Sequence, residues 1–280
     1  MTPYYEHAGI TIYHGDCRDI LPSLDAVDVV VTDPPYSEHV HGKSRRGGSL
    51  PDAQNGPAAC YSRVAELGFG SLQADVREFC AGEFARLARR WILTFADAES
   101  VHLWQRDLEA KGLEHVRVGA WVKLGATPQF TGDRPAAGFE AIEIAHRPGR
   151  KRWNGGGSHA LWSVPIALDR AGNGARLHTT QKPLPLMAAL VRLFSDDGET
   201  ILDPFMGSGS TLVAAKQLGR KAIGIEIEER YVEIAIRRLE QEVLPFEHEE
   251  PRAGIQGSLL EEVATDAQAV QGEDVRGVRA

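Results

Sequence analysis

The sequence predicts an α/β fold in which a doubly wound, mostly parallel sheet carries an antiparallel hairpin at one edge. Apolar runs of four to eight residues alternate with amphipathic stretches over most of the 280 residues, a pattern typical of parallel sheets covered by helices. Two of the runs end in an acidic residue, one before a proline turn and one before a glycine-rich loop. Ligands of open α/β sheets bind at this end of the strands, so both loops are candidate sites.

The individual elements follow from the hydrophobic periodicity. Strands are expected at 27–32, 91–95, 115–122, 139–145, 199–202 and 221–225. Helices are expected at about 72–90, 98–111, 184–195, 210–219 and 228–242. No helical stretch separates 115–122 from 139–145, so these two strands are expected to pair antiparallel near one edge of the sheet.

Most of the chain, residues 1–244, is expected to form one catalytic domain. Two segments interrupt it. Residues 37–71 are rich in Gly, Ser, Pro and Ala and are expected to form a mobile loop. Residues 146–176 combine basic side chains with tryptophans and a run of three glycines. Residues 245–280 are acidic and poor in aromatics, which is typical of a disordered tail.

The composition excludes several classes of protein. The three cysteines show no Cys-x-x-Cys spacing, so we expect no disulfide framework and no metal site, and a reducing cytoplasm fits. No apolar run approaches the roughly 18 residues of a membrane span, and the first seven residues lack a secretory pattern. We therefore expect a cytoplasmic protein without membrane partners.

The net charge of −8 is unevenly distributed. Residues 1–225 contain 25 acidic and 25 basic side chains, whereas residues 226–280 contain 14 acidic and 6 basic ones. The stretch 144–182 has seven basic side chains against Asp169 alone. Binding to phosphates depends on such local patches, so an acidic total does not exclude nucleic acid as a partner.

The proline turn is Asp33-Pro34-Pro35-Tyr36. Its carboxylate, its rigid backbone carbonyl and its aromatic ring suit a flat base that carries an exocyclic amine. Such an amine is a poor nucleophile, and acceptors that bond its hydrogens localise the lone pair. An ordinary strand-ending turn is the alternative interpretation, because Asp and Pro favour turns in any case.

The glycine-rich loop runs from Asp203 to Thr211. Ser210 stands where a phosphate-binding loop needs Lys, and Leu212 stands near the place of a dinucleotide site's third glycine. The next strand ends at Glu226, nineteen residues beyond Gly207. A carboxylate there can accept bonds from both hydroxyls of a ribose. The alternative is that Glu226 only begins a solvated helix face.

Together, these motifs resemble the β group of the amino-methylating DNA methyltransferases, which use S-adenosyl-L-methionine. Here the Asp-Pro-Pro-Tyr turn precedes a basic stretch, then the segment 178–183, then the glycine loop. This permuted order resembles that group over about residues 10 to 240. Thr179 stands where the family usually has Pro. The resemblance implies a Rossmann-like methyltransferase sheet.

The resemblance also implies the reaction: site-specific, direct in-line methyl transfer to N6 of adenine in double-stranded DNA, on a base flipped out of the duplex. N4 of cytosine is the alternative, although relatives acting there usually carry Ser at the position of Asp33. Families that act on RNA or protein glutamine generally carry Asn there and place the glycine loop first. A catalytically silent DNA-binding module is a further alternative. A cognate restriction enzyme and a homodimer are partners that the class admits.

The roles of single residues are also implied by the resemblance. The catalytic set is Asp33, Pro34, Pro35 and Tyr36. The cofactor-binding set is Asp16, Cys17, His178, Thr180, Lys182, Asp203, Pro204, Phe205, Gly207, Ser208, Gly209, Ser210, Thr211 and Glu226. The DNA-binding set is Lys43, Arg45, Arg46, Arg147, Arg150, Lys151, Arg152 and Trp153.

Asp16 and Lys182 of these sets, and Trp121 outside them, need a further remark. Asp16 contacts the cofactor adenine in relatives, but a turn Asp that bonds its own backbone fits equally well. Lys182 is suited to pair with the cofactor carboxylate. Trp121 either walls the base pocket or, as its size favours, lies in the core.

Overall fold

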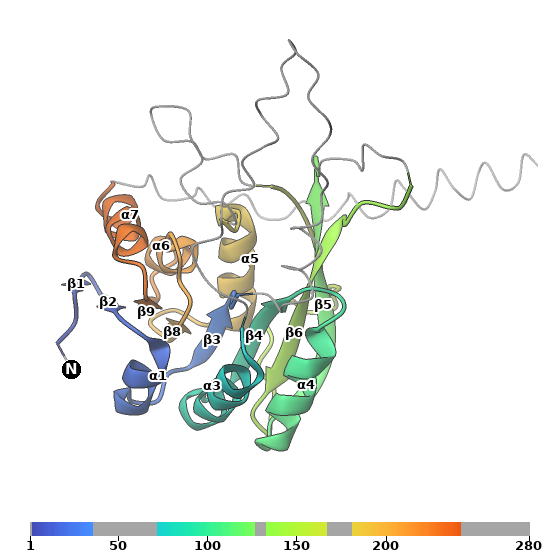
Figure 1. Ribbon diagram of the computed structural model, residues 1–280, viewed down its shortest axis with the longest axis horizontal. Coiled ribbons are helices and arrows are strands. Elements are labelled where there is room, and N and C mark those ends of the chain that lie inside the picture. Colours follow the sequence, from blue (N-terminus) through green and yellow to red (C-terminus); the bar gives the residue numbers. More distant parts are fainter. Residues whose placement is uncertain (1, 36–71, 127–132, 167–180, 242–280) are drawn as a thin grey trace, which may run out of the picture. The chain divides into compact units, whose positions relative to one another are not determined.

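The computed structural model describes residues 2–35, 72–126, 133–166 and 181–241, which belong to one compact unit. The strands of this part form a single mixed sheet in the order β1-β2-β9-β8-β3-β4-β6-β5-β7 (Figure 1). They are β1 Tyr5–His7, β2 Ile10–His14, β3 Val29–Thr32, β4 Trp91–Ala96, β5 Glu114–Leu124, β6 Phe139–His146, β7 Leu161–Pro165, β8 Thr200–Asp203 and β9 Lys221–Glu226.

Helices cover both faces of the sheet (Figure 1). Apolar side chains of α5, α6 and α7 pack on one face, and those of α1, α3 and α4 pack on the other. The central strand β3 is buried on both sides, so it reads as an unbroken apolar run rather than an alternation. The helices are α1 Cys17–Ile20, the 3-10 helix η1 Leu21–Ser23, α3 Ala74–Leu87, α4 Val101–Ala110, α5 Leu184–Phe194, α6 Ser210–Gln217 and α7 Glu229–Glu240.

The predicted fold class is confirmed. The parallel pairs β3–β4, β3–β8, β8–β9 and β2–β9 make up the doubly wound part. The predicted hairpin is present, since β5 and β6 pair antiparallel and β6 also pairs antiparallel with β4. Strand β7 was not predicted; it adds to β5 in parallel at the edge of the sheet.

The ends of the parallel strands define two sides of the sheet, called here the carboxyl edge and the amino edge. The carboxyl ends of β3, β8 and β9 lie together because these strands are parallel neighbours. The carboxyl end of β6 lies at the opposite edge, where His146 is the register partner of Trp91 at the start of β4. Among the described helices, none combines the length and the apolar composition that a membrane crossing requires.

Candidate active site

The two motif loops meet at the carboxyl edge of the sheet and are tied together by Asp203. Its carboxylate accepts from the Thr32 hydroxyl (2.9 Å), from the Thr211 hydroxyl (2.5 Å) and from the backbone N–H of Phe205 (3.2 Å). Burial raises the pKa of Asp203 to about 7, against the effect of these hydrogen bonds. Since Thr32 directly precedes Asp33, this network fixes the proline turn against the glycine loop.

A cavity of about 490 Å³ opens between the loops, within the range of about 300–1,000 Å³ typical of small-molecule sites. Most of the predicted catalytic and cofactor residues line it: Asp16, Cys17, Asp33, Pro34, Pro35, Lys182, Asp203, Pro204, Phe205, Gly207, Ser208, Ser210, Thr211 and Glu226. Tyr36, His178 and Thr180 lie outside the described residues.

Gly209 serves the loop rather than the cavity lining. It has a φ of 77° at the N-cap of α6, a backbone conformation that favours glycine. A Cβ at this position would also approach the Cβ of Ala235 on α7 to 2.7 Å. The glycine therefore lets α6 begin directly beneath the loop while α7 packs closely against it.

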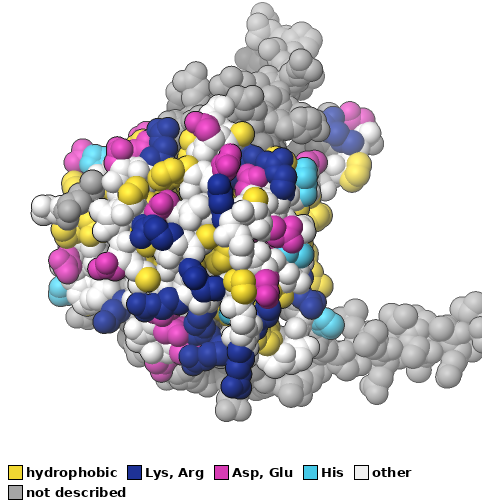
Figure 2. Space-filling view, turned by 90° about the horizontal axis from the view of Figure 1, so that it is seen from below, with side chains coloured by type: hydrophobic (Ala, Val, Ile, Leu, Met, Phe, Trp, Pro, Cys, Tyr) yellow, Lys and Arg dark blue, Asp and Glu magenta, His cyan; other side chains and the backbone are white. Residues whose placement is uncertain are grey.

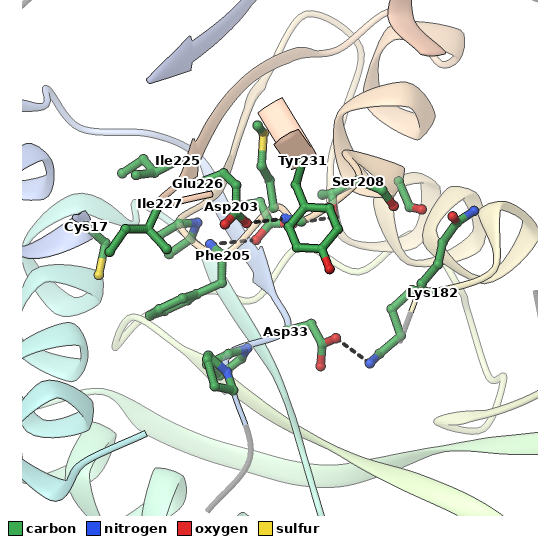
Figure 3. Close-up of a pocket in the computed structure, with 18 of the residues that line it drawn as sticks. Cys17, Asp33, Lys182, Asp203, Phe205, Ser208, Ile225, Glu226, Ile227 and Tyr231 are labelled. Carbon is green, nitrogen blue, oxygen red and sulfur yellow. Dashed lines mark hydrogen bonds and ion pairs between the residues drawn. The ribbon is translucent and has the colours of Figure 1, made fainter. Parts of the chain in front are cut away.

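Glu226 supports the glycine loop from β9 (Figure 3). Its Oε2 accepts from the backbone N–H of Gly207 and its Oε1 from that of Glu228, both at 2.9 Å. Burial raises the pKa of Glu226. Because a carboxylate has about four acceptor positions, each oxygen can accept one further bond. Glu226 is thus held by the backbone in a pose that fits a ribose diol.

A second support for the glycine loop comes from α7. The Arg238 guanidinium donates to the Ser208 carbonyl at 2.6 Å and to the hydroxyls of Ser208 and Ser210 at 3.2 Å each. Sequence reasoning missed Arg238 because it lies within an ordinary amphipathic helix and belongs to no motif. Its place on the helix face toward α6 appears only once both helices are packed.

Asp16 adopts the local pose that was its alternative interpretation. It is the N-cap of α1, where its carboxylate accepts from the Arg18 N–H at 2.8 Å. It also pairs with the Arg18 guanidinium at 2.6 Å, and this hydrogen bonding lowers the pKa of Asp16. Asp16, Cys17 and Arg18 still line the cavity, so the turn contributes to its wall.

Lys182 has two carboxylate partners that the sequence did not predict. Its Nζ lies 2.5 Å from Asp33 Oδ2 (Figure 3). The same Nζ lies 3.0 Å from Glu140 Oε2. Lys182 therefore contacts the proline turn, and its predicted pairing with the methionine end of the cofactor stays a prediction, since Lys182 also lines the cavity. The physical reason for the two contacts is that Lys182 is 7% exposed, and a buried ammonium needs close anionic partners. Two carboxylates satisfy it here.

Glu140 is the other residue of this cluster that the motifs did not reveal. It lies on β6, and its Oε1 pairs with Lys123 Nζ at 2.6 Å. A signal was present, because the period of two places Glu140 on the same face as the buried Ile142 and Ile144. A carboxylate on an apolar face indicates a buried partner.

Trp121 belongs to the core, as its size favoured. It is 3% exposed, and its Nε1 donates to the carbonyl of Val164 on β7 at 2.9 Å. Its ring lies beneath the charged cluster, with the Nζ of Lys123 at 5.3 Å and that of Lys182 at 6.0 Å from the centroid.

The basic segment 147–153 lies at the amino edge of β4, opposite the cavity. Figure 2 views the molecule from this side, where Lys and Arg side chains gather with Asp and Glu among them. Arg147 donates to the carbonyls of Ala85 (2.5 Å) and Ala88 (3.0 Å) at the end of α3. Lys151 pairs with Glu114.

The rest of this segment is also used within the molecule. Arg152 pairs with Asp196, and its carbonyl accepts from Trp91 Nε1 at 2.6 Å. The Trp153 ring packs on Phe194 with 4.8 Å between centroids. Arg150 is exposed. The DNA-binding role of Arg147, Arg150, Lys151, Arg152 and Trp153 stays a prediction, and their position opposite Asp33 does not support contacts close to the target base. Lys43, Arg45 and Arg46 lie outside the described residues.

Comparisons with known proteins agree with the motifs. A family model described as DNA methylase matches residues 27–237. The chain is 26% identical over 262 residues to the Type II methyltransferase M2.DpnII of Streptococcus pneumoniae, covering 86% of this chain and 93% of the relative. It is 27% identical over 257 residues to the Type II methyltransferase M2.LlaDCHI of Lactococcus lactis subsp. cremoris, covering 85% and 91%.

Solved structures show the same fold. The crystal structure of an M1.HpyAVI–SAM complex aligns with a TM-score of 0.61 and 25% identity, over 82% of this chain and 99% of that one. PvuII DNA methyltransferase, described as cytosine-N4-specific, aligns with a TM-score of 0.64 over 97% of this chain and 96% of that one. At 14% identity the latter shows the fold alone. The chain belongs to the DNA methylase family and is an S-adenosylmethionine-dependent DNA methyltransferase, as its motifs and their order predicted.

Proposed function

We propose that this enzyme methylates N6 of adenine in double-stranded DNA by direct in-line transfer to a flipped base. The observation that carries the proposal is the environment of Asp33, which directly follows the central strand β3 and lines the cavity. Its Oδ2 is bonded to Lys182, while its Oδ1 is buried and accepts no hydrogen bond from the described residues. This leaves Oδ1 as an acceptor for one hydrogen of an amino group.

The residues around the cavity fit S-adenosylmethionine, which supplies an electrophilic methyl group when bound. Glu226 would hold the ribose hydroxyls, and the backbone of the glycine loop would hold the methionine end. Phe205 and the 57% exposed Ile227 give the cavity apolar walls that suit an adenine ring. These residue roles are part of our proposal and rest on the shape and donor set of the cavity.

The catalytic turn would activate the amine through hydrogen bonding. Asp33 Oδ1 and the Pro34 carbonyl would each accept one amino hydrogen, so that the nitrogen lone pair turns away from the ring. Pro34 is buried and the next residue is again proline, so the turn keeps its shape without the help of a substrate. Most of the rate would come from this fixed placement.

The choice of adenine over cytosine rests on Asp33, since cytosine-N4 relatives usually carry Ser at that position. Nucleoside analysis of DNA methylated by the purified enzyme tests it, and N6-methyladenine is the expected product. Recovery of N4-methylcytosine alone would overturn the acceptor while keeping the mechanism. Absence of any methyl transfer would favour the silent DNA-binding alternative.

DNA would approach the carboxyl edge, because Asp33 lies there. We therefore compare two triple variants in a binding titration against salt. Replacing Lys43, Arg45 and Arg46 with Ala should flatten the log–log salt slope by up to about 2–3 units, since each phosphate contact contributes about 0.9. Replacing Arg150, Lys151 and Arg152 tests the other predicted phosphate contacts, which lie at the amino edge; if the duplex approaches the carboxyl edge, the slope changes less in this variant. The reverse result would place the duplex at the amino edge.

The biological setting remains part of the proposal. Two relatives are Type II methyltransferases, which supports a cognate restriction enzyme for this chain as well. We also propose a cytoplasmic location, where bacterial DNA is accessible, and a homodimer as the form to test by sedimentation.

A further inference from the structure

Four charged side chains of alternating sign run from the catalytic turn across the neighbouring strands. Asp33 Oδ2 lies 2.5 Å from Lys182 Nζ, Lys182 Nζ lies 3.0 Å from Glu140 Oε2, and Glu140 Oε1 lies 2.6 Å from Lys123 Nζ. The two inner side chains are 7% and 12% exposed, and the two outer ones are 22% exposed each. The chain of charges is therefore most deeply buried in its middle.

Lys182 is held at this place from several sides. Its ammonium lies between two carboxylates and over the Phe95 ring, 4.9 Å from the centroid. Its backbone immediately precedes Pro183, the N-cap of α5. Burial by itself would lower the pKa of Lys182, but Asp33 and Glu140 together hold that pKa above its usual range. The ammonium is therefore charged and fixed.

The charges around Asp33 shift its pKa in opposite directions. Burial raises the pKa of Asp33 to about 6; Lys182 and, more weakly, Lys123 lower it, whereas Glu140 raises it. The negative charge of Asp33 also contributes to the raised pKa of Asp203 on β8. The carboxylate form of Asp33 at neutral pH thus depends on the nearest cation.

We propose that Lys182 and Glu140 are a positioning pair for the catalytic carboxylate. Glu140 anchors the ammonium, the ammonium binds Asp33 Oδ2, and the carboxyl group is thereby oriented with Oδ1 toward the substrate amine. Neither residue touches the reacting atoms in this role. The inference rests on the proposed function, because it gives Asp33 its task.

The test measures single-turnover methyl transfer to duplex DNA as a function of pH, together with cofactor affinity by calorimetry. Lys182→Met removes the charge and keeps the length of the side chain. In this variant the acid limb of the pH–rate profile, where the transfer rate falls as the pH is lowered, should move up by about 1–3 pH units. This is the usual effect of losing one close opposite charge. Cofactor Kd should stay within threefold.

Glu140→Gln separates orientation from charge. It removes a neighbouring negative charge, so the acid limb should not move up, while the plateau rate should fall at least tenfold because Lys182 loses its anchor. Lys182→Arg keeps the charge, so the limb should stay in place and the plateau should fall through altered geometry. Lys111→Met is the matched control, since Lys111 forms an exposed pair with Glu78 at 3.2 Å; it should match the wild type.

Two results would overturn the inference. One is an unmoved limb in Lys182→Met with cofactor affinity lost, which would return Lys182 to the cofactor carboxylate. The other is a pH-independent transfer rate equal to that of the wild type in Glu140→Gln or Lys182→Arg. If Lys182→Met does not fold, Lys182→Arg is the variant that decides. Failure of the proposed function is distinct, because the wild-type enzyme would then show no transfer to adenine.

Discussion

Replacing Glu226 by Gln should weaken cofactor binding and loosen the glycine loop at the same time. Each carboxylate oxygen accepts one backbone N–H, from Gly207 and from Glu228. Gln keeps the size of the side chain but offers one oxygen only. The amide NH₂ group of Gln is a donor, so it cannot accept a hydrogen bond. Depending on its orientation, either a backbone N–H of the loop or a ribose hydroxyl loses its acceptor.

The expected size follows from the lost bonds. A hydrogen bond to a charged group is worth about 1.5–3 kcal/mol, which corresponds to about a 10- to 150-fold rise in the cofactor Kd. A donor of the loop left without its acceptor costs about 1–3 kcal/mol more in the free enzyme. For a domain of this size, each kcal/mol lowers the Tm by roughly 2–4 °C.

Calorimetric titration with S-adenosylmethionine and thermal unfolding without ligand measure the two effects separately. Asp33→Asn is the control, since its side chain lies on the catalytic turn. A Glu226→Gln variant that binds the cofactor within twofold of wild type would refute the ribose assignment. So would an Asp33→Asn variant that loses cofactor affinity while Glu226→Gln keeps it.

Three further outcomes are expected. Asp33→Asn should abolish methyl transfer and leave cofactor Kd within a few-fold; retained transfer would show that the carboxylate is not needed. In the wild type, the transfer rate should fall by up to about tenfold for each pH unit below about 6, because burial raises the pKa of Asp33 to about 6 and the protonated acid is a much weaker acceptor than the carboxylate; a limb near pH 4 would mean that Asp33 is solvated. Arg238→Met should weaken cofactor binding more than turnover at saturation, since Arg238 holds the Ser208 carbonyl; equal loss in both would contradict a role limited to the loop.

The fold was predictable where local pattern and tertiary packing agree. Buried parallel strands such as β3 are continuous apolar runs, and their helices are amphipathic, so periodicity locates both. The edge strands were missed for a physical reason. In β7, Trp162 is the one buried residue, and Pro165 ends the strand. An edge strand tolerates this proline, whereas a central strand does not. Its pairing with β5 is nonlocal.

The site was predictable only as far as motifs reach. The loops carry backbone requirements, such as the positive φ of Gly209, that restrict the sequence visibly. Glu140 and Arg238 act through partners that are far away along the chain. Arg238 has no local signature, and the only local sign of Glu140 is its place on the apolar face of β6. The basic segment shows the converse limit: its charges are visible in the sequence, but their contacts are not. Arg147 donates to backbone carbonyls, and Lys151 and Arg152 pair with carboxylates of the same molecule.

The order of the motifs along the chain matters little to the chemistry, because the sheet supplies their contact. Thr32 and Asp203 are 171 positions apart, yet β3 and β8 are parallel neighbours and the two side chains meet at 2.9 Å. Any connection that keeps these two strands adjacent and parallel brings the proline turn beside the glycine loop. A permuted chain can therefore assemble one active site, provided that the strand order in the sheet is retained.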